Sequence, residues 1–213
     1  MKMKQLILIL VLWVCATSAM AQEMRSIFVN LPDSIEPLLT KVNREDCIDF
    51  LDSDMKALVK NRFDRTAELK ELTKDYLQMQ LTDVSSFEMK LLPLKDSVMV
   101  IGLIKTVCSS ACNSHIRFFD TSWNELDTAE FFRLPSEDLF YLPKDSVGDD
   151  FDELRSEADV YLTKLAFSSN NSTLTVTYTT PDYLNKDNRE KLAPYLKNQP
   201  IVMDWKEGRF VLK

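Results

Sequence analysis

Residues 85–120 have the sequence SSFEMKLLPLKDSVMVIGLIKTVCSSACNSHIRFFD. Apolar and polar side chains alternate over 87–91, which is the two-residue period of a strand with one face in water. Residues 98–107 are almost wholly apolar and rich in β-branched side chains, which indicates a central strand buried on both faces. A third strand is expected over 116–119. Because the connections are short, this stretch predicts an antiparallel meander.

Upstream of this stretch, apolar residues recur at helical spacing before the period changes. The pattern predicts two helical stretches, 33–42 and 47–59, separated by a break over 43–46. A shorter helix is predicted over 66–73. The period then falls to two over 77–81, which predicts a strand ahead of the meander.

Downstream, the sequence predicts two hairpins and one helix. The first hairpin joins 161–167 to 174–178. A helix is expected over 181–196, and the second hairpin joins 201–205 to 209–212. The whole pattern predicts the α+β class: a mainly antiparallel sheet of meander and hairpins, with N-terminal helices and one C-terminal helix packed on it.

The composition limits the classes of protein and of site. The chain has 213 residues, of which 45% are apolar and 28% charged, as is typical of a globular protein. Its three glycines, Gly102, Gly148 and Gly208, lie far apart, which excludes a P-loop and a dinucleotide-binding loop. A single histidine excludes multi-histidine metal sites, and no cofactor is expected. We expect a single α+β domain over 22–213, with a boundary between subregions within 126–151, where prolines and acidic residues interrupt the pattern.

The N-terminal segment has the three parts of a secretory signal peptide. A basic start, Met1–Lys4, precedes an apolar run over 6–14 and the small-residue ending Ala19-x-Ala21. We expect cleavage after Ala21 and export to the periplasm or the outer membrane, rather than an uncleaved anchor or a lipid on Cys15. No later run approaches the ~20 apolar residues of a membrane-spanning helix.

Export makes the protein more acidic. The formal net charge is −7, and loss of Lys2 and Lys4 with residues 1–21 lowers it to −9. An acidic surface repels phosphate groups, so we expect no nucleic-acid partner.

Two cysteines are spaced as if to close a turn. Cys108 and Cys112 flank three small residues, and an exported protein meets an oxidising compartment. A disulfide between them is the first interpretation. A metal site that includes His115, or a reactive thiol with His115 as its base, are the alternatives.

The middle of the chain is rich in aromatic and acidic residues. The aromatic side chains either form a surface for a partner or a sugar, or pack the loops onto the sheet. The candidate surface residues are Phe118, Trp123, Phe131, Phe132, Phe140 and Tyr141. An acidic group, which either binds calcium or forms a solvated loop, consists of Asp149, Asp150, Asp152 and Glu153.

Several segments resemble a family of exported Bacteroidetes proteins of unknown function. The resemblance covers roughly residues 28–125. It rests on Leu31-Pro32-Asp33-Ser34 with Leu38-Leu39, Val59-Lys60-Asn61-Arg62, Leu91-Leu92-Pro93-Leu94, Val98 to Val107, Thr106-Val107-Cys108-x3-Cys112 and Ile116-Arg117-Phe118-Phe119-Asp120-x2-Trp123. It implies a cell-envelope setting in a gram-negative anaerobe. It brings no activity and no catalytic residues.

That setting adds a modification hypothesis. Asp-Ser or Asp-Thr followed by an apolar residue or Thr is the pattern that this group of bacteria O-glycosylates. Thr128 and Ser146 fit it best, because they lie in the irregular stretch. Helix caps and turns use the same residue pairs and are the alternative.

No nucleophile, base and oxyanion-binding group assemble in the sequence, so catalysis is not the first expectation. We expect a non-catalytic module that binds an envelope protein or glycan. The alternative is a glycan-acting hydrolase or a lectin-like protein that uses the aromatic and acidic region 118–153. A small periplasmic chaperone-like or inhibitor protein is a third hypothesis.

Overall fold

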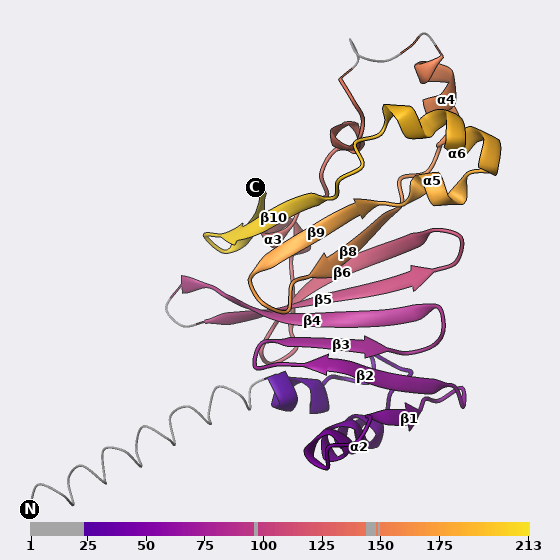
Figure 1. The fold of residues 1–213 in the computed structure, drawn as a ribbon. Helices are drawn as coiled ribbons and strands as arrows, with labels where there is room; N and C mark the ends of the chain where they lie inside the picture. Colours follow the sequence, from indigo (N-terminus) through magenta and orange to yellow (C-terminus); the bar gives the residue numbers. More distant parts are fainter. Residues whose placement is uncertain (1–23, 96–97, 144–147, 149) are drawn as a thin grey trace, which may run out of the picture. The chain divides into compact units, whose positions relative to one another are not determined.

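The computed structural model of the protein describes residues 24–95, 98–143, 148 and 150–213 (Figure 1). The predicted signal peptide, residues 1–21, lies outside the described residues. The chain divides into two compact units, residues 1–82 and 83–213, which are described separately. The region 126–151, where we expected a boundary, lies inside the second unit. That 22–213 form a single domain stays a prediction.

The first unit consists of helical turns followed by a meander. Residues 24–29 are helical, and α2, Lys41–Asp52, follows a series of turns. Thr40 caps α2, because its side chain accepts a hydrogen bond from the Asn43 N–H while the Asn43 side chain accepts one from the Thr40 N–H. The predicted break over 43–46 is therefore wrong: Asn43 belongs to a capping box at the start of a continuous helix.

Three antiparallel strands complete the first unit. They are β1 (Leu58–Lys60), β2 (Thr66–Leu72) and β3 (Tyr76–Gln80), with β2 paired to both neighbours. The strand predicted over 77–81 is confirmed as β3.

The helix predicted over 66–73 is wrong, because these residues form β2. Its residues are good helix formers, but Ala67 and Leu69 are buried while Thr66 and Lys70 are exposed. Pairing on both sides and a period-two burial pattern outweigh the local helix propensity.

The second unit begins with the predicted meander. It contains β4 (Ser85–Pro93), β5 (Met99–Cys108), β6 (Cys112–Asp120) and β7 (Glu125–Leu126), each antiparallel to the next. The five residues 100–104 of β5 are buried in succession, which confirms a strand covered on both faces.

A four-stranded antiparallel sheet follows in the same unit (Figure 1). It contains β8 (Thr163–Phe167), β9 (Thr173–Tyr178), β10 (Ile201–Lys206) and β11 (Arg209–Leu212), in the order β11-β10-β9-β8. Both predicted hairpins are confirmed. The turn of the second hairpin is Glu207-Gly208, with φ of 51° and 83°, and such left-handed pairs favour glycine and match the twist of the strands.

Short helices connect these strands. They are α3 (Thr128–Phe131), η2 (Glu137–Phe140), α4 (Phe151–Glu157), α5 (Thr180–Tyr183), α6 (Lys186–Leu192) and η4 (Ala193–Tyr195). The C-terminal helix predicted over 181–196 is thus three short pieces, because Asn185 caps a new helix by accepting from the Asn188 N–H. Helix α6 packs on α4 through a small apolar cluster that includes Leu154 and Leu192.

The two units together confirm the α+β class with antiparallel sheets. Among the described residues, no helix is long and apolar enough to cross a membrane.

Candidate functional site

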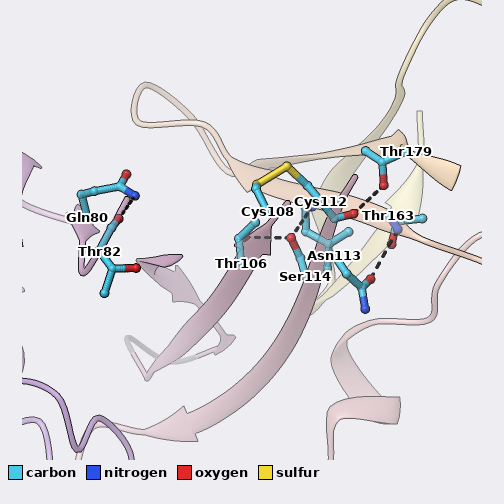
Figure 2. The surroundings of a disulfide bond; sticks show 10 residues. Gln80, Thr82, Thr106, Cys108, Cys112, Asn113, Ser114, Thr163 and Thr179 are labelled. Carbon is cyan, nitrogen blue, oxygen red and sulfur yellow. Dashed lines mark hydrogen bonds between the residues drawn. A yellow bond between two sulfur atoms is a disulfide. The ribbon is translucent and has the colours of Figure 1, made fainter. Parts of the chain in front are cut away.

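The disulfide predicted between Cys108 and Cys112 is present (Figure 2). The two residues face each other as the last pair of the β5–β6 ladder, with their Cα atoms 4.0 Å apart. Bonded sulfur atoms are neither thiolate ligands nor nucleophiles. Within the described ranges, no group of three His, Cys, Asp or Glu side chains is arranged to hold a metal ion.

The residues next to the disulfide bind the second sheet of their own unit. The Cys112 carbonyl accepts a hydrogen bond from the Thr179 hydroxyl at 2.5 Å, and Asn113 Oδ1 accepts from the Thr163 N–H at 3.5 Å (Figure 2). Ser114 Oγ accepts from the Leu165 N–H at 3.0 Å. Side chains from β6 thus pair with the outer edge of β8.

A side chain of β4 also accepts a hydrogen bond from the edge of β8. Glu88 is buried, and its Oε2 accepts from the Phe167 N–H at 2.8 Å. Gly102 allows the Phe167 ring to approach, since a Cβ there would lie 2.7 Å from Phe167 Cζ. Side chains of β4 and β6 therefore accept hydrogen bonds from alternate N–H groups of β8. These bonds pair an otherwise open strand edge and attach β8 to the meander, which is a structural role.

The aromatic residues predicted to form a partner surface are mostly interior. Trp123 alone among the six is partly exposed, and its ring packs on Phe119 at 5.4 Å between centroids. The other five are at most 8% exposed: Phe118, Phe131, Phe132, Phe140 and Tyr141. That a partner contacts this region stays a prediction, but these five rings pack the loops onto the sheets.

A polar network joins Tyr141, Tyr178 and Glu137. The Tyr178 hydroxyl donates to Glu137 Oε1 at 2.5 Å, so it accepts from the Tyr141 hydroxyl at 2.8 Å. Burial raises the pKa of both phenols, and it raises the pKa of Tyr161 to about 12. These phenols stay protonated at neutral pH, and each hydroxyl donates to an acceptor within the protein. The network therefore stabilises the fold.

The remaining sequence candidates are dispersed. Asp149 and Ser146 lie outside the described residues. Asp150 accepts a hydrogen bond from the Tyr195 hydroxyl at 2.6 Å, while Asp152 and Glu153 are exposed in the first turn of α4.

Thr128 is the first residue of α3. The preceding Asp127 caps that helix by accepting from the Ala129 N–H at 3.0 Å. The helix-cap alternative therefore applies to this Asp-Thr pair, and the O-glycosylation of Thr128 stays a prediction.

The second unit contains an open groove with a volume of about 690 Å³, within the usual range for ligand sites. It lies where the β4–β5 hairpin, α3 and the β10–β11 hairpin come together. Its lining is mainly apolar and consists of Pro93, Leu94, Lys95, Val98, Glu130, Phe131, Trp205, Glu207 and Gly208. We call it the apolar groove. Val98 is 54% exposed, so the apolar lining is open to solvent.

Trp205 lines the apolar groove and is held by aromatic contacts and one hydrogen bond. Its ring stacks on Phe131 at 6.2 Å and packs edge-on against Phe210 at 4.9 Å. The indole Nε1 donates to the Pro93 carbonyl at 2.7 Å. Because the only polar atom of this ring is already paired, the groove presents it as an apolar face.

The glycine of the β10–β11 turn shapes the groove. A Cβ on Gly208 would lie 3.0 Å from Leu94 Cδ2, so the absence of a side chain lets the two hairpins meet. The charged groups of the lining are Glu130, Glu207 and Lys95, two carboxylates against one ammonium group.

The sequence patterns did not identify Trp205 as a site residue. It lies in a strand where Met203 and Trp205 point to the same face, so the alternation predicts only a core position. The turn that follows could have identified it. A tryptophan directly before a Lys-Glu-Gly turn lies at the end of its strand, where a core residue is partly exposed.

Comparison with known proteins places the chain in a family. Residues 16–210 match the family described as "Protein of unknown function (DUF3256)", and the chain belongs to that family. A solved structure described as a domain of an uncharacterized protein from Porphyromonas gingivalis W83 is similar, with a TM-score of 0.80 and 25% identity. The likeness covers 91% of this chain and 98% of that one. No curated protein matches. The resemblance to a Bacteroidetes family of unknown function is thereby confirmed, and the match extends beyond the expected residues 28–125.

Proposed function

We propose that this member of the DUF3256 family is an exported, non-catalytic binding module of the cell envelope, and that the apolar groove is its binding site. The observation that carries the proposal is an open groove of about 690 Å³ that is lined by the Trp205 ring, which Phe131 and a hydrogen bond hold in place. Export rests on the predicted signal peptide over 1–21.

The chemistry of the groove favours a protein partner over a small polar ligand. Trp205 has no free donor, and Leu94, Val98 and Phe131 offer only apolar contact. Burial of a partner's apolar side chain in such a site lowers the free energy, because apolar surface leaves water. The groove gives a polar ligand few partners to replace its hydrogen bonds to water. Since Glu130 and Glu207 outnumber Lys95, the favoured partner carries a cation beside its apolar anchor.

A lectin-like function is the second candidate. An aromatic ring beside two carboxylates is also a platform on which a sugar ring stacks while its hydroxyls bond to the acids. Trp205 with Glu130 and Glu207 supplies that combination. Cleavage of signal peptide 1–21 would leave Trp123 and Trp205 as the only tryptophans, so a bound sugar would change tryptophan fluorescence. The change should disappear in Trp205→Phe.

The test uses two matched valine substitutions. Val98→Asp places a charge in the apolar groove, and Val107→Asp places one at the other end of the same hairpin. The two side chains are 54% and 58% exposed, so neither change disturbs the core. Each mature protein is tagged and recovered from the native host after cross-linking, and the recovered partner is then purified and titrated.

Binding should weaken at least tenfold in Val98→Asp and stay unchanged in Val107→Asp. Equal affinity for the two variants would rule out the groove as the site. A fluorescence response to envelope glycans, with no protein recovered, would favour the lectin-like candidate.

Export has its own test. The intact mass of the protein from its native host should correspond to a chain that starts at Gln22. Additional hexose mass on Thr128 or Ser146 would support the glycosylation hypothesis. A mass that includes residues 1–21 would contradict cleavage and leave only the groove part of the proposal.

A further inference from the structure

The turn between β1 and β2, residues 60–65, is fixed by one buried side chain. Asn61 is 5% exposed; its Oδ1 accepts from the Phe63 N–H at 2.9 Å and the Arg65 N–H at 3.1 Å. Its Nδ2 donates to the Leu81 carbonyl at 2.7 Å. The Asn61 N–H also donates to the Arg65 carbonyl at 2.9 Å. The backbone of this turn is therefore held in one conformation.

The fixed turn holds an aromatic ring in solvent. Phe63 is 72% exposed, the largest exposed fraction among the large apolar side chains of the described residues. The hydrogen bonds to Asn61 fix the backbone that carries this ring. An aromatic side chain on a fixed backbone loses less conformational entropy on binding than one on a flexible loop, which suits an interface anchor.

The charges around Phe63 are mainly positive. Lys60, Arg62 and Arg65 flank it against Asp64, in a chain whose formal net charge is −7. Arg62 pairs with Asp33 at 2.6 Å. The turn thus combines an apolar anchor with neighbouring cations.

The second unit contains the complementary site. The apolar groove is lined by aromatic and aliphatic side chains and carries Glu130 and Glu207 against Lys95. We propose that the Phe63 turn of one copy docks into the apolar groove of a second copy of this chain. In this contact the Phe63 ring lies against Trp205, while Lys60 and Arg65 face the two glutamates. The inference rests on the proposed function, because it names the occupant of the same groove.

The contact permits two kinds of assembly. Each copy offers one turn and one groove, so two copies can exchange their turns reciprocally in a two-fold dimer, or successive copies can join head to tail. Association should therefore grow with protein concentration and weaken as salt screens the charges.

Sedimentation velocity over a wide range of micromolar concentrations tests the proposal with the mature chain. The wild type should shift to larger species as concentration rises. Phe63→Ser and Val98→Asp should each raise the dissociation constant at least tenfold. The controls Tyr183→Ser and Val107→Asp change residues that are each 58% exposed and should behave as the wild type does. Matching thermal unfolding curves show that every variant is folded.

A mixture of the two defective variants tests the proposal more specifically. Phe63→Ser keeps an intact groove and Val98→Asp keeps an intact turn, so an equimolar mixture should form one-to-one dimers and nothing larger. A wild type that is monomeric at every concentration, or association that survives in Phe63→Ser, overturns the inference. If the wild type is monomeric while Val98→Asp still loses a recovered partner, the proposed function stands alone.

Discussion

Two hairpin turns of this protein are closed in different ways and use their side chains differently. The β5–β6 turn is closed by the Cys108–Cys112 bond, and Cys112, Asn113 and Ser114 form hydrogen bonds to β8 and to Thr179, the residue after β9. The β1–β2 turn is closed by buried Asn61, and Phe63 within it is left in solvent. A turn whose polar groups serve its own chain stabilises the fold. A turn fixed around an exposed aromatic ring is suited to a partner.

The largest expected effect comes from Asn61→Ala. The substitution removes three side-chain hydrogen bonds at a buried position, so the free energy of unfolding should fall by about 3 kcal/mol. Urea denaturation measures the loss. Asn61→Asp keeps the two acceptor bonds but places a carboxylate oxygen against the Leu81 carbonyl, so it should also destabilise the protein, and more at neutral pH than in acid. A loss below about 1 kcal/mol in the alanine variant would mean that Asn61 does not hold the turn.

The disulfide should matter less to global stability. It closes a very short loop, so replacing Cys108 and Cys112 together by serine should cost at most about 2 kcal/mol. The effect should be local: amide exchange should accelerate at Leu165, whose N–H bonds to Ser114. Ser109→Ala in the same turn is the control. Unchanged exchange at Leu165 would separate the disulfide from the docking of β8.

The buried tyrosines also direct their polar groups to their own chain, and they make the stability of the fold depend on pH. The folded pKa of Tyr161 is about 12 against an ordinary value of 10, so folding favours the protonated phenol. The stabilisation is complete below pH 10 and is lost as the pH rises towards 12. Urea denaturation across this range should show falling stability, with a shallower fall in Tyr161→Phe. Parallel profiles for the two proteins would assign the alkaline sensitivity to other groups.

The smallest effect on stability is expected at Phe63. Because the ring is 72% exposed, Phe63→Ser should change the free energy of unfolding by no more than about 0.5 kcal/mol. Thermal unfolding, with Tyr183→Ser as the control, checks this. A large loss would show that the ring packs on its own chain, and the contrast between the two turns would fail.

The sequence predicted the elements whose pattern and environment agree. Residues 98–107 are almost wholly apolar and form most of β5, in which 100–104 are buried in succession, and the spacing of Cys108 and Cys112 matched the last pair of its ladder. The helix expected over 66–73 failed because strand pairing outweighed propensity. The groove was not predictable, because Leu94, Glu130 and Trp205 come from three separated segments that only the tertiary fold brings together.

The docking of the Phe63 turn into the apolar groove is tested most directly by photo-cross-linking. Phe63 is replaced by p-benzoylphenylalanine, which preserves an aromatic anchor, and isotope-labelled and unlabelled copies are mixed so that mass spectrometry identifies links between molecules. The same replacement at Tyr183 is the control. We expect links from position 63 to groove residues 93–95, 98, 205, 207 and 208 of another copy. No link between copies, or links mainly to other segments, would contradict the account.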